Sequence, residues 1–272
     1  MNSGYFTAEA CKNTFVLYDR LNLKEVDDNL FKLVHANLMK EDKDDALILI
    51  DGKIKGKDFY AKMIVLGQDA TFGEFCGNGS RVCANYLFSK YQDMENFYLV
   101  SNLGIMKMYK YENNIYAIDL PLVRFVINEK FIAKKELFEK EDEFYFIKLE
   151  GKKFYYAEAI EPHLVLQEKV SDKELFELGQ KLNQRKDIFP NGININACDI
   201  VEENLLKVKT YERGVQRLTQ SCGTGSSSSC AIYLKGKKNK VKVHTPGGLL
   251  EITLKDNSIE LKGPANIEIY KE

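Results

Sequence analysis

The sequence repeats one cysteine-containing motif in its two halves. FCGNGSRVCANYLF spans residues 75–88, and SCGTGSSSSCAIYL spans residues 221–234. Both read Cys-Gly-(Asn or Thr)-Gly-Ser and continue through a second cysteine, an alanine and an apolar tail that contains a tyrosine. About half of the 272-residue chain separates Cys76 from Cys222. This spacing predicts an internally duplicated chain with one motif in each half.

Two further pairs of segments support the duplication. Downstream of the motifs, NLGIMKMYKYENNIYAIDLP ends at Pro121 and PGGLLEITLKDNSIELKGP ends at Pro264. Each begins at a glycine turn, alternates apolar and polar residues, breaks at a turn containing asparagine and alternates again, which predicts a hairpin. Upstream, NTFVLY from Asn13 matches EPHLVL from Glu161. Because the three matches occur in the same order, the two halves should share one topology.

The apolar segments and turns predict a mixed α/β chain. We expect helices at residues 26–38, 79–90, 172–184 and 225–235, and Ser171 with Glu174 reads as a capping box before the third. Strands rich in Ile, Val, Phe and Tyr are expected at residues 14–18, 46–55, 58–66, 97–101, 105–111, 115–120, 144–150, 153–159, 163–167, 197–202, 204–211, 240–244, 249–255 and 258–262. In each half, the Cys-Gly-x-Gly turn would join a strand to the N-terminus of a helix.

Composition excludes several classes of partner. With 39 basic and 40 acidic residues the formal net charge is −1, so no overall field attracts nucleic acid or an anionic membrane. No stretch approaches 18 apolar residues and the N-terminus does not read as a secretory leader, so we expect a cytoplasmic protein with a small-molecule partner. The six cysteines read as thiols, of which four (Cys11, Cys83, Cys198 and Cys230) are expected in the core. No metal is expected, because there is no Cys-x-x-Cys pair and the three histidines lie far apart.

The two cysteine turns suggest acid–base chemistry on an amino acid. Amide groups at a helix N-terminus bind anions, and glycines let a carboxylate approach them closely. A cysteine just before such a terminus has its pKa drawn below about 8.5 and gains thiolate character near neutral pH. Two such thiols suit racemisation, in which one thiolate removes the α-proton and the other thiol returns a proton to the opposite face. The amides would stabilise the charge that develops on the carboxylate.

Beyond the two turns, further motifs occur in order along nearly the whole chain. They are Asn13-Thr-Phe, Pro162-His163, Phe189-Pro-Asn-Gly-Ile-Asn194, Tyr211-Glu-Arg-Gly and Thr245-Pro-Gly-Gly. Together with CGNG and CGTG, they make the chain resemble the diaminopimelate epimerase family of cofactor-independent amino-acid racemases. This resemblance implies two pseudo-symmetric α/β (α+β) halves, each a curled, mainly antiparallel sheet around a central helix. Residues 1–121 would form the first half and 122–264 the second, with strand 265–272 returning to the first.

The resemblance also implies roles for individual residues. Cys76 and Cys222 would be the catalytic acid–base pair, with no cofactor. The amides of Gly77, Asn78, Gly223 and Thr224 would hold the α-carboxylate, and Asn13, Asn194, Glu212 and Arg213 fall on substrate-contacting positions. We expect the enzyme to be a homodimer.

Two departures from the family pattern bear on the substrate. Gly67 and Glu161 stand where members acting on diaminopimelate usually carry asparagines that bind the far end of that substrate. A carboxylate at Glu161 would repel a distal carboxylate and attract an imidazole or an amine, whereas Arg213 is a natural partner for a carboxylate. We therefore favour histidine or another amino acid with a basic side chain, with diaminopimelate as the alternative.

Two other classes of function stay open. An isomerase of the same architecture acting on a non-amino-acid substrate, as in phenazine-biosynthesis relatives, would typically lack the paired cysteines. A non-catalytic amino-acid-binding protein would use the glycine turns without proton transfer.

Overall fold

The computed structural model describes residues 4–272, and the chain separates into two compact units. Met1–Asp119 and Lys262–Glu272 belong to the first unit, and Leu120–Leu261 forms the second. The division therefore falls just before the boundary at residue 121 that the sequence suggests, and the chain returns to the first unit slightly earlier than residue 265. No helix within residues 4–272 has the length and apolar character needed to cross a membrane.

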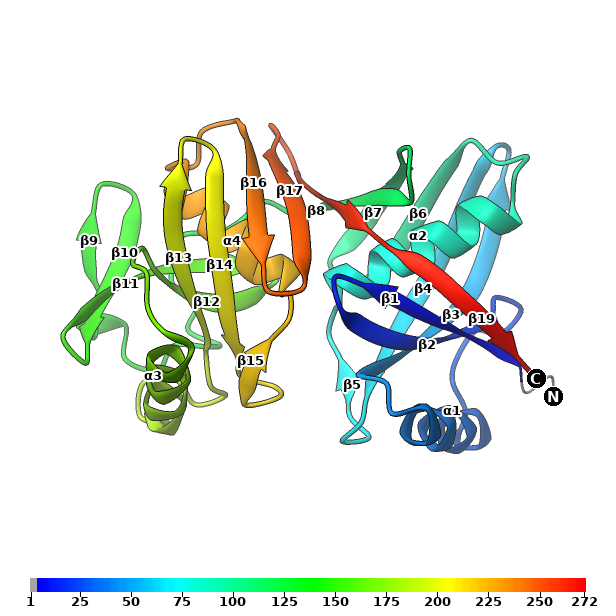
Figure 1. The fold of residues 1–272 in the computed structure, drawn as a ribbon, viewed down its shortest axis with the longest axis horizontal. Helices are drawn as coiled ribbons and strands as arrows, with labels where there is room; N and C mark the ends of the chain where they lie inside the picture. The colour runs from blue at the N-terminus through cyan, green and yellow to red at the C-terminus, as the bar shows by residue number, and fades with distance from the viewer. Residues whose placement is uncertain (1–3) are drawn as a thin grey trace. The chain divides into compact units, whose positions relative to one another are not determined.

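Within residues 4–272, each unit contains strands and two α-helices (Figure 1). The first contains β1 (Tyr5–Ala10), β2 (Asn13–Arg20), α1 (Asp28–Glu41), β3 (Asp45–Lys55), β4 (Asp58–Gly67), β5 (Phe72–Gly73), α2 (Gly77–Lys90), β6 (Asn96–Ser101), β7 (Gly104–Lys110), β8 (Ile115–Leu120) and β19 (Asn266–Lys271). The second contains a short 3-10 turn η1 (Lys135–Leu137), β9 (Glu139–Glu141), β10 (Phe144–Leu149), β11 (Lys152–Ala159), β12 (Glu161–Leu166), α3 (Asp172–Gln184), β13 (Asn194–Glu202), β14 (Leu205–Glu212), β15 (Arg217–Thr219), α4 (Gly223–Tyr233), β16 (Lys240–Thr245) and β17 (Gly248–Leu254). Strand β18 (Ile259–Pro264) spans the boundary.

The two units repeat one pattern of strand pairing. In the first, β1 pairs antiparallel with β2, β2 parallel with β3, β3 antiparallel with β4 and β4 parallel with β6. In the second, β11 to β14 and β16 follow the same sequence of antiparallel and parallel pairs. The duplication that the motifs predict is thus present in the topology, and the expected α/β architecture is confirmed.

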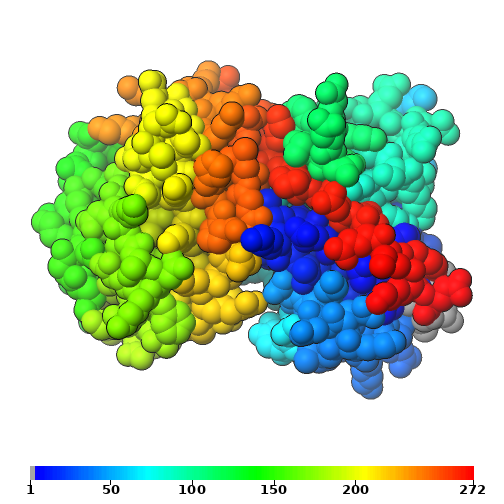
Figure 2. Space-filling model, in the orientation of Figure 1, coloured from blue at the N-terminus to red at the C-terminus, as the bar shows by residue number. Residues whose placement is uncertain are grey.

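The C-terminal strand completes the repeat in the first unit. Strand β19 pairs antiparallel with β1, and β10 pairs antiparallel with the equivalent strand β11 in the second unit. Figure 2 shows the red C-terminal strand beside the blue N-terminal segment. The two units thus have equivalent outer strands, supplied by β19 in the first unit and by β10 in the second.

Helices α2 and α4 are the central helices of their units. Helix α2 packs against β1, β6, β7 and β19, and α4 packs against β11 to β14 and β17. Residues 77–87 of α2 and 225–232 of α4 are buried, and the serines at 226–229 are fully enclosed. These small residues on α4 let the sheet approach the helix closely. Cys11, Cys83, Cys198 and Cys230 are all buried, as expected.

The amphipathic helices α1 and α3 each have a side-chain N-cap, and that of α3 is the predicted Ser171. Asp27 accepts a hydrogen bond from the amide of Leu30 at 2.8 Å, and the Ser171 hydroxyl accepts one from the amide of Glu174 at 3.1 Å. The reciprocal half of the capping box is replaced, because the Glu174 carboxylate pairs with Lys152. Each helix buries its apolar face, and each unit has a hydrophobic core of its own.

Candidate active site

Both cysteine turns cap the central helix that follows them. Cys76 is the N-cap of α2, and its sulfur accepts a hydrogen bond from the Gly79 amide at 3.2 Å. Cys222 is the N-cap of α4, and its sulfur accepts one from the Gly225 amide at 3.4 Å. Neither helix carries an acidic residue in its first turn. Each sulfur is therefore half-buried beside the positive end of a helix dipole.

The second glycine of each turn is required by close approach. A β-carbon at Gly79 would lie 2.6 Å from a methyl of Leu47. One at Gly225 would lie 2.4 Å from Asn196 Oδ1 and 3.3 Å from the sulfur of Cys222. The glycines thus allow each thiol turn to pack directly on its sheet, which fixes the position of the sulfur.

In the first unit, a buried arginine lies behind the Cys76 turn. Arg81 is fully buried on α2, and its guanidinium donates to the carbonyl of Gly77 at 3.2 Å and to Asn78 Oδ1 at 2.7 Å. Its Nη2 also lies 3.6 Å from the sulfur of Cys11. Burial lowers the pKa of Arg81, and the nearby thiols Cys11 and Cys76 oppose that effect. Gly77 and Asn78, both predicted site residues, are thus held by one side chain.

Asn13 begins β2 directly after a strained turn. Cys11 and Lys12 adopt positive φ angles of 52° and 62°, a left-handed conformation that favours glycine. Because Cys11 contacts Arg81, this turn and the Cys76 turn meet at one side chain. The structure therefore brings Asn13 to the same end of the first unit as Asn78.

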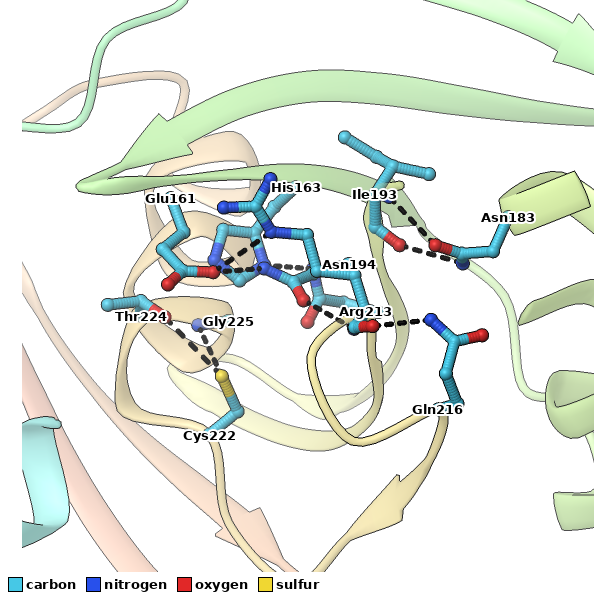
Figure 3. A network of polar contacts seen from close by, with 11 residues as sticks. Glu161, His163, Asn183, Ile193, Asn194, Arg213, Gln216, Cys222, Thr224 and Gly225 are labelled. Atoms are coloured by element: carbon cyan, nitrogen blue, oxygen red, sulfur yellow. Dashed lines mark hydrogen bonds and ion pairs between the residues drawn. The ribbon is translucent and has the colours of Figure 1, made fainter. Parts of the chain in front are cut away.

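In the second unit, three predicted residues form one polar network (Figure 3). Glu161 Oε2 accepts from Asn194 Nδ2 at 3.1 Å and pairs with Arg213 Nε at 3.3 Å. Asn194 Oδ1 accepts from the backbone amide of Arg213 at 2.9 Å, so its amide orientation is defined by both contacts. The guanidinium of Arg213 also stacks over the Phe131 ring. Glu161 is thus a half-buried, paired carboxylate rather than a solvent-facing one.

Glu212 lies on the other side of the strand end, beside Cys222. Its carboxylate accepts from the Thr219 hydroxyl at 2.5 Å and is within hydrogen-bonding reach of the Cys222 thiol. Desolvation and the Glu212 carboxylate raise the pKa of Cys222 well above its ordinary value, while Thr224, whose hydroxyl lies 3.4 Å from the sulfur, opposes this. Arg213, which follows the last residue of β14, pairs with Glu161 rather than with Glu212.

A buried histidine contacts Asn196, whose side chain packs against Gly225 of the Cys222 turn. His163 is fully buried, and its Nδ1 accepts a hydrogen bond from Asn196 Nδ2 at 3.1 Å. Asn196 Oδ1 in turn accepts from the Thr210 hydroxyl at 2.8 Å. Burial lowers the pKa of His163 to about 3, so the ring is neutral and its proton lies on Nε2. Within residues 4–272, Nε2 has no hydrogen-bond partner.

The chain is similar in sequence to proteins of known family. A family model described as diaminopimelate epimerase matches residues 159–268. The diaminopimelate epimerase of Wigglesworthia glossinidia brevipalpis is 31% identical over 229 residues, covering 82% of each chain. That of Thermotoga maritima is 28% identical over 254 residues, covering 92% of this chain and 94% of the relative.

This chain belongs to the diaminopimelate epimerase family. It is an isomerase of the racemase and epimerase class. Solved structures share the fold at low identity. A hydroxyproline epimerase from Agrobacterium vitis has a TM-score of 0.64 at 12% identity, covering 98% of this chain and 91% of its own. A phenazine-biosynthesis family protein from Enterococcus faecalis has a TM-score of 0.61 at 14% identity, covering 98% and 97%.

Sequence reasoning missed Arg81 and the Asn196–Thr210 pair. Aligning the two cysteine motifs places Arg81 opposite Ser227, and this exchange of a charge for a small hydroxyl was the available signal. Asn196 and Thr210 lie on strands among apolar residues, and no feature of the sequence marked them as part of the site. No group of three or more metal-ligating side chains occurs within the part of the chain that the structure describes.

Proposed function

We propose that the protein inverts the α-carbon of an amino acid by two-thiol proton transfer, using Cys76 and Cys222 and no cofactor. The supporting observation is that both cysteines cap a central helix in the same way, each accepting an amide hydrogen bond at its sulfur. The amides of Gly77, Asn78, Gly223 and Thr224 are the proposed carboxylate donors.

The proposed step conserves protons and charge. A thiolate takes the α-proton, so the C–H bond breaks as an S–H bond forms, and the electron pair spreads onto the substrate carboxylate. Amides at a helix N-terminus stabilise that charge. The second thiol then gives its proton to the other face of the α-carbon and becomes the thiolate.

Diaminopimelate is the substrate that the relatives favour. Several curated relatives bear that name, and one is 31% identical over most of both chains. Arg213 supports it too, because a guanidinium can bind a second carboxylate in a forked geometry.

Histidine, or another amino acid with a basic side chain, is a second candidate that Glu161 favours. The Glu161 carboxylate occupies Arg213 Nε and Asn194 Nδ2, which are donors that a distal substrate carboxylate would need. It offers a hydrogen-bond acceptor to an imidazole or amine instead.

The test is turnover of LL-diaminopimelate and a panel of L-amino acids, with chiral analysis of the products. Cys76→Ala and Cys222→Ala should each lose inversion by a factor of about 10³ or more, since each removes one proton carrier. In D₂O, the single-cysteine variants should retain exchange of the α-proton on the face that the remaining thiol serves. Cys230→Ala is the matched control, because this buried thiol lies on α4 beyond the turn. Near-normal inversion by either alanine variant would disprove the two-thiol mechanism, and binding without turnover by the wild type would identify a binding protein.

A further inference from the structure

We propose that in the resting enzyme Cys76 carries the thiolate, that the buried guanidinium of Arg81 balances its charge, and that Cys222 carries the proton. Arg81 is then a positioning residue that sets which thiol is ready to act as the base. The assignment of catalytic roles rests on the function proposed above, whereas the unequal protonation of the two thiols is a property of the free protein.

Arg81 is a buried cation without a carboxylate. It is fully enclosed in α2, and within residues 4–272 its contacts are the Gly77 carbonyl, Asn78 Oδ1 and the sulfur of Cys11. Its Nε has no partner. The nearest ion pair on α2, between Lys90 and Asp19, lies at the opposite end of the helix. A buried charge left uncompensated is strongly destabilising, so this site calls for an anion nearby.

The groups near Arg81 that can become anionic are thiols. Cys11 and Cys76 both favour the charged form of Arg81 electrostatically. Of the two, Cys76 accepts an amide hydrogen bond at the N-terminus of α2, and both features stabilise a thiolate. Within residues 4–272, the sulfur of Cys11 contacts the Arg81 guanidinium but accepts no backbone amide hydrogen bond. Cys83, further along the helix, stays a thiol because burial raises its pKa.

The Cys222 turn has the opposite electrostatic surroundings. Ser227 occupies the position of Arg81 and donates to the Gly223 carbonyl at 2.9 Å, as Arg81 does to Gly77. Two carboxylates lie near the turn. The negative charges of Glu212, which is beside the thiol, and of Glu161 both raise the pKa of Cys222. Arg213 forms an ion pair with Glu161, and the positive charge of Arg217 lowers the pKa of Glu212. The negative charge of each carboxylate is therefore partly balanced by an arginine.

The repeat allows the two turns to be compared position by position, and several of the equivalent positions differ in charge. Helix position Arg81 corresponds to Ser227. The first residue of β2 is Asn13, and that of the equivalent β12 is Glu161; the last residue of β4 is Gly67, and that of the equivalent β14 is Glu212. These three differences make the surroundings of Cys76 more positive than those of Cys222, whereas Glu74 opposite Gln220 and Gln68 opposite Arg213 act in the other direction. Arg81 differs from the rest because it is fully buried and donates hydrogen bonds to two residues of the Cys76 turn, so we infer that it decides which unit favours the thiolate.

The experiment follows alkylation of the purified full-length protein by iodoacetamide, read at each cysteine by peptide mass spectrometry as a function of pH. Only a thiolate reacts appreciably. We expect Cys76 to react at least about tenfold faster than Cys222 at pH 7. Equal rates, faster reaction at Cys222, or preferential reaction at Cys11 would overturn the proposal.

Variants separate charge from structure. Arg81→Met keeps most of the buried volume and should move the midpoint of Cys76 alkylation upward by about one pH unit or more, whereas Arg81→Lys should restore most of the wild-type profile. Arg20→Met is the control, because Arg20 is a buried arginine at the end of β2, near Asp19 rather than the cysteine turn. A folded Arg81→Met protein with the wild-type profile would refute the role of Arg81. If that variant does not fold, the wild-type comparison of Cys76 with Cys222 still decides the assignment.

Turnover is measured separately, so the two proposals fail in different ways. Unequal, Arg81-dependent alkylation in a protein that inverts no amino acid would leave the thiolate assignment and remove the proposed function. Inversion by a protein whose two thiols react at equal rates would support the proposed function and refute the thiolate assignment.

Discussion

Replacing Glu161 with asparagine should shift the enzyme towards diaminopimelate and away from histidine. In the wild type, a distal substrate carboxylate must displace Glu161 from Arg213 Nε and Asn194 Nδ2, which lie 3.3 and 3.1 Å from its Oε2. Asparagine removes the competing charge and adds an amide donor. The same change removes the anionic acceptor that an imidazole would use.

The magnitude follows from the geometry of the ion pair. At 3.3 Å and an effective dielectric near 20, the attraction is about 5 kcal/mol before desolvation. The side chains of Arg213 and Glu161 are 14% and 25% exposed, so desolvation and solvent screening offset much of this attraction. A net effect of about 1.4–2.8 kcal/mol corresponds to a ratio of about 10 to 100. We therefore expect the ratio of kcat/KM for LL-diaminopimelate to that for L-histidine to rise about 10- to 100-fold.

The assay measures both substrates by chiral chromatography on one enzyme preparation. Glu168→Gln is the control, because Glu168 is also an ion-paired glutamate of the second unit but lies on the surface against Lys152. The ratio should stay constant in that variant. An unchanged or lowered ratio in a folded Glu161→Asn protein would refute the competition for Arg213 and Asn194.

Two further predictions concern packing and pH. Gly225→Ala should cost about 1–3 kcal/mol of unfolding free energy and most of the activity, because the new methyl would lie 2.4 Å from Asn196 Oδ1; Gly214→Ala, with nothing within 4 Å, should change stability by less than about 0.5 kcal/mol in the same urea titration. Burial lowers the pKa of His163 to about 3 in the folded protein, so the ring stays neutral there. In the unfolded chain the ring becomes protonated near its ordinary pKa of 6.5. Stability should therefore fall as pH drops from about 6.5 towards 3, by up to about 1.4 kcal/mol per pH unit, and His163→Gln should flatten this limb; a slope equal to that of the wild type would contradict the assignment.

Long, periodic segments were predictable from the sequence, and short strands were not. The hairpins after each motif and all four helices were predicted, although α1 begins two residues later and ends three residues later than expected. Strand β1 was missed because YFTAEA contains alanine and glutamate, which favour strands weakly, and it forms by pairing with β2 and β19. Strands β5 and β15 have two and three residues, and β9 has three, so pairing partners rather than periodicity define them. The central helices begin at Gly77 and Gly223, two residues earlier than expected, because cysteine serves as the N-cap.

The sequence singled out several residues that the structure brings together, but it indicated only part of their contacts. Glu161, Asn194 and Arg213 could be singled out by position in the motifs, but the sequence left open whether Glu161 faces solvent or pairs with Arg213. The partner is set by the parallel pairing of β12 with β13, which places two strand starts side by side, and by the end of β14 beside them. Such long-range register has no local signal.

The duplication explains why this fold suits inversion and also why it needs asymmetry. Two copies of one turn supply two equivalent sets of amides and two equivalent sulfurs, so the backbone alone would give both thiols the same proton affinity. In the proposed two-thiol mechanism, one cysteine must be a thiolate and the other a protonated thiol at the start of each cycle. Side chains that break the repeat, Arg81 opposite Ser227 and Gly67 opposite Glu212, can supply that difference while the backbone stays symmetric. After one transfer the thiolate would lie beside Glu212, which is the less favourable state, and proton exchange with solvent would restore the resting form before the next substrate arrives.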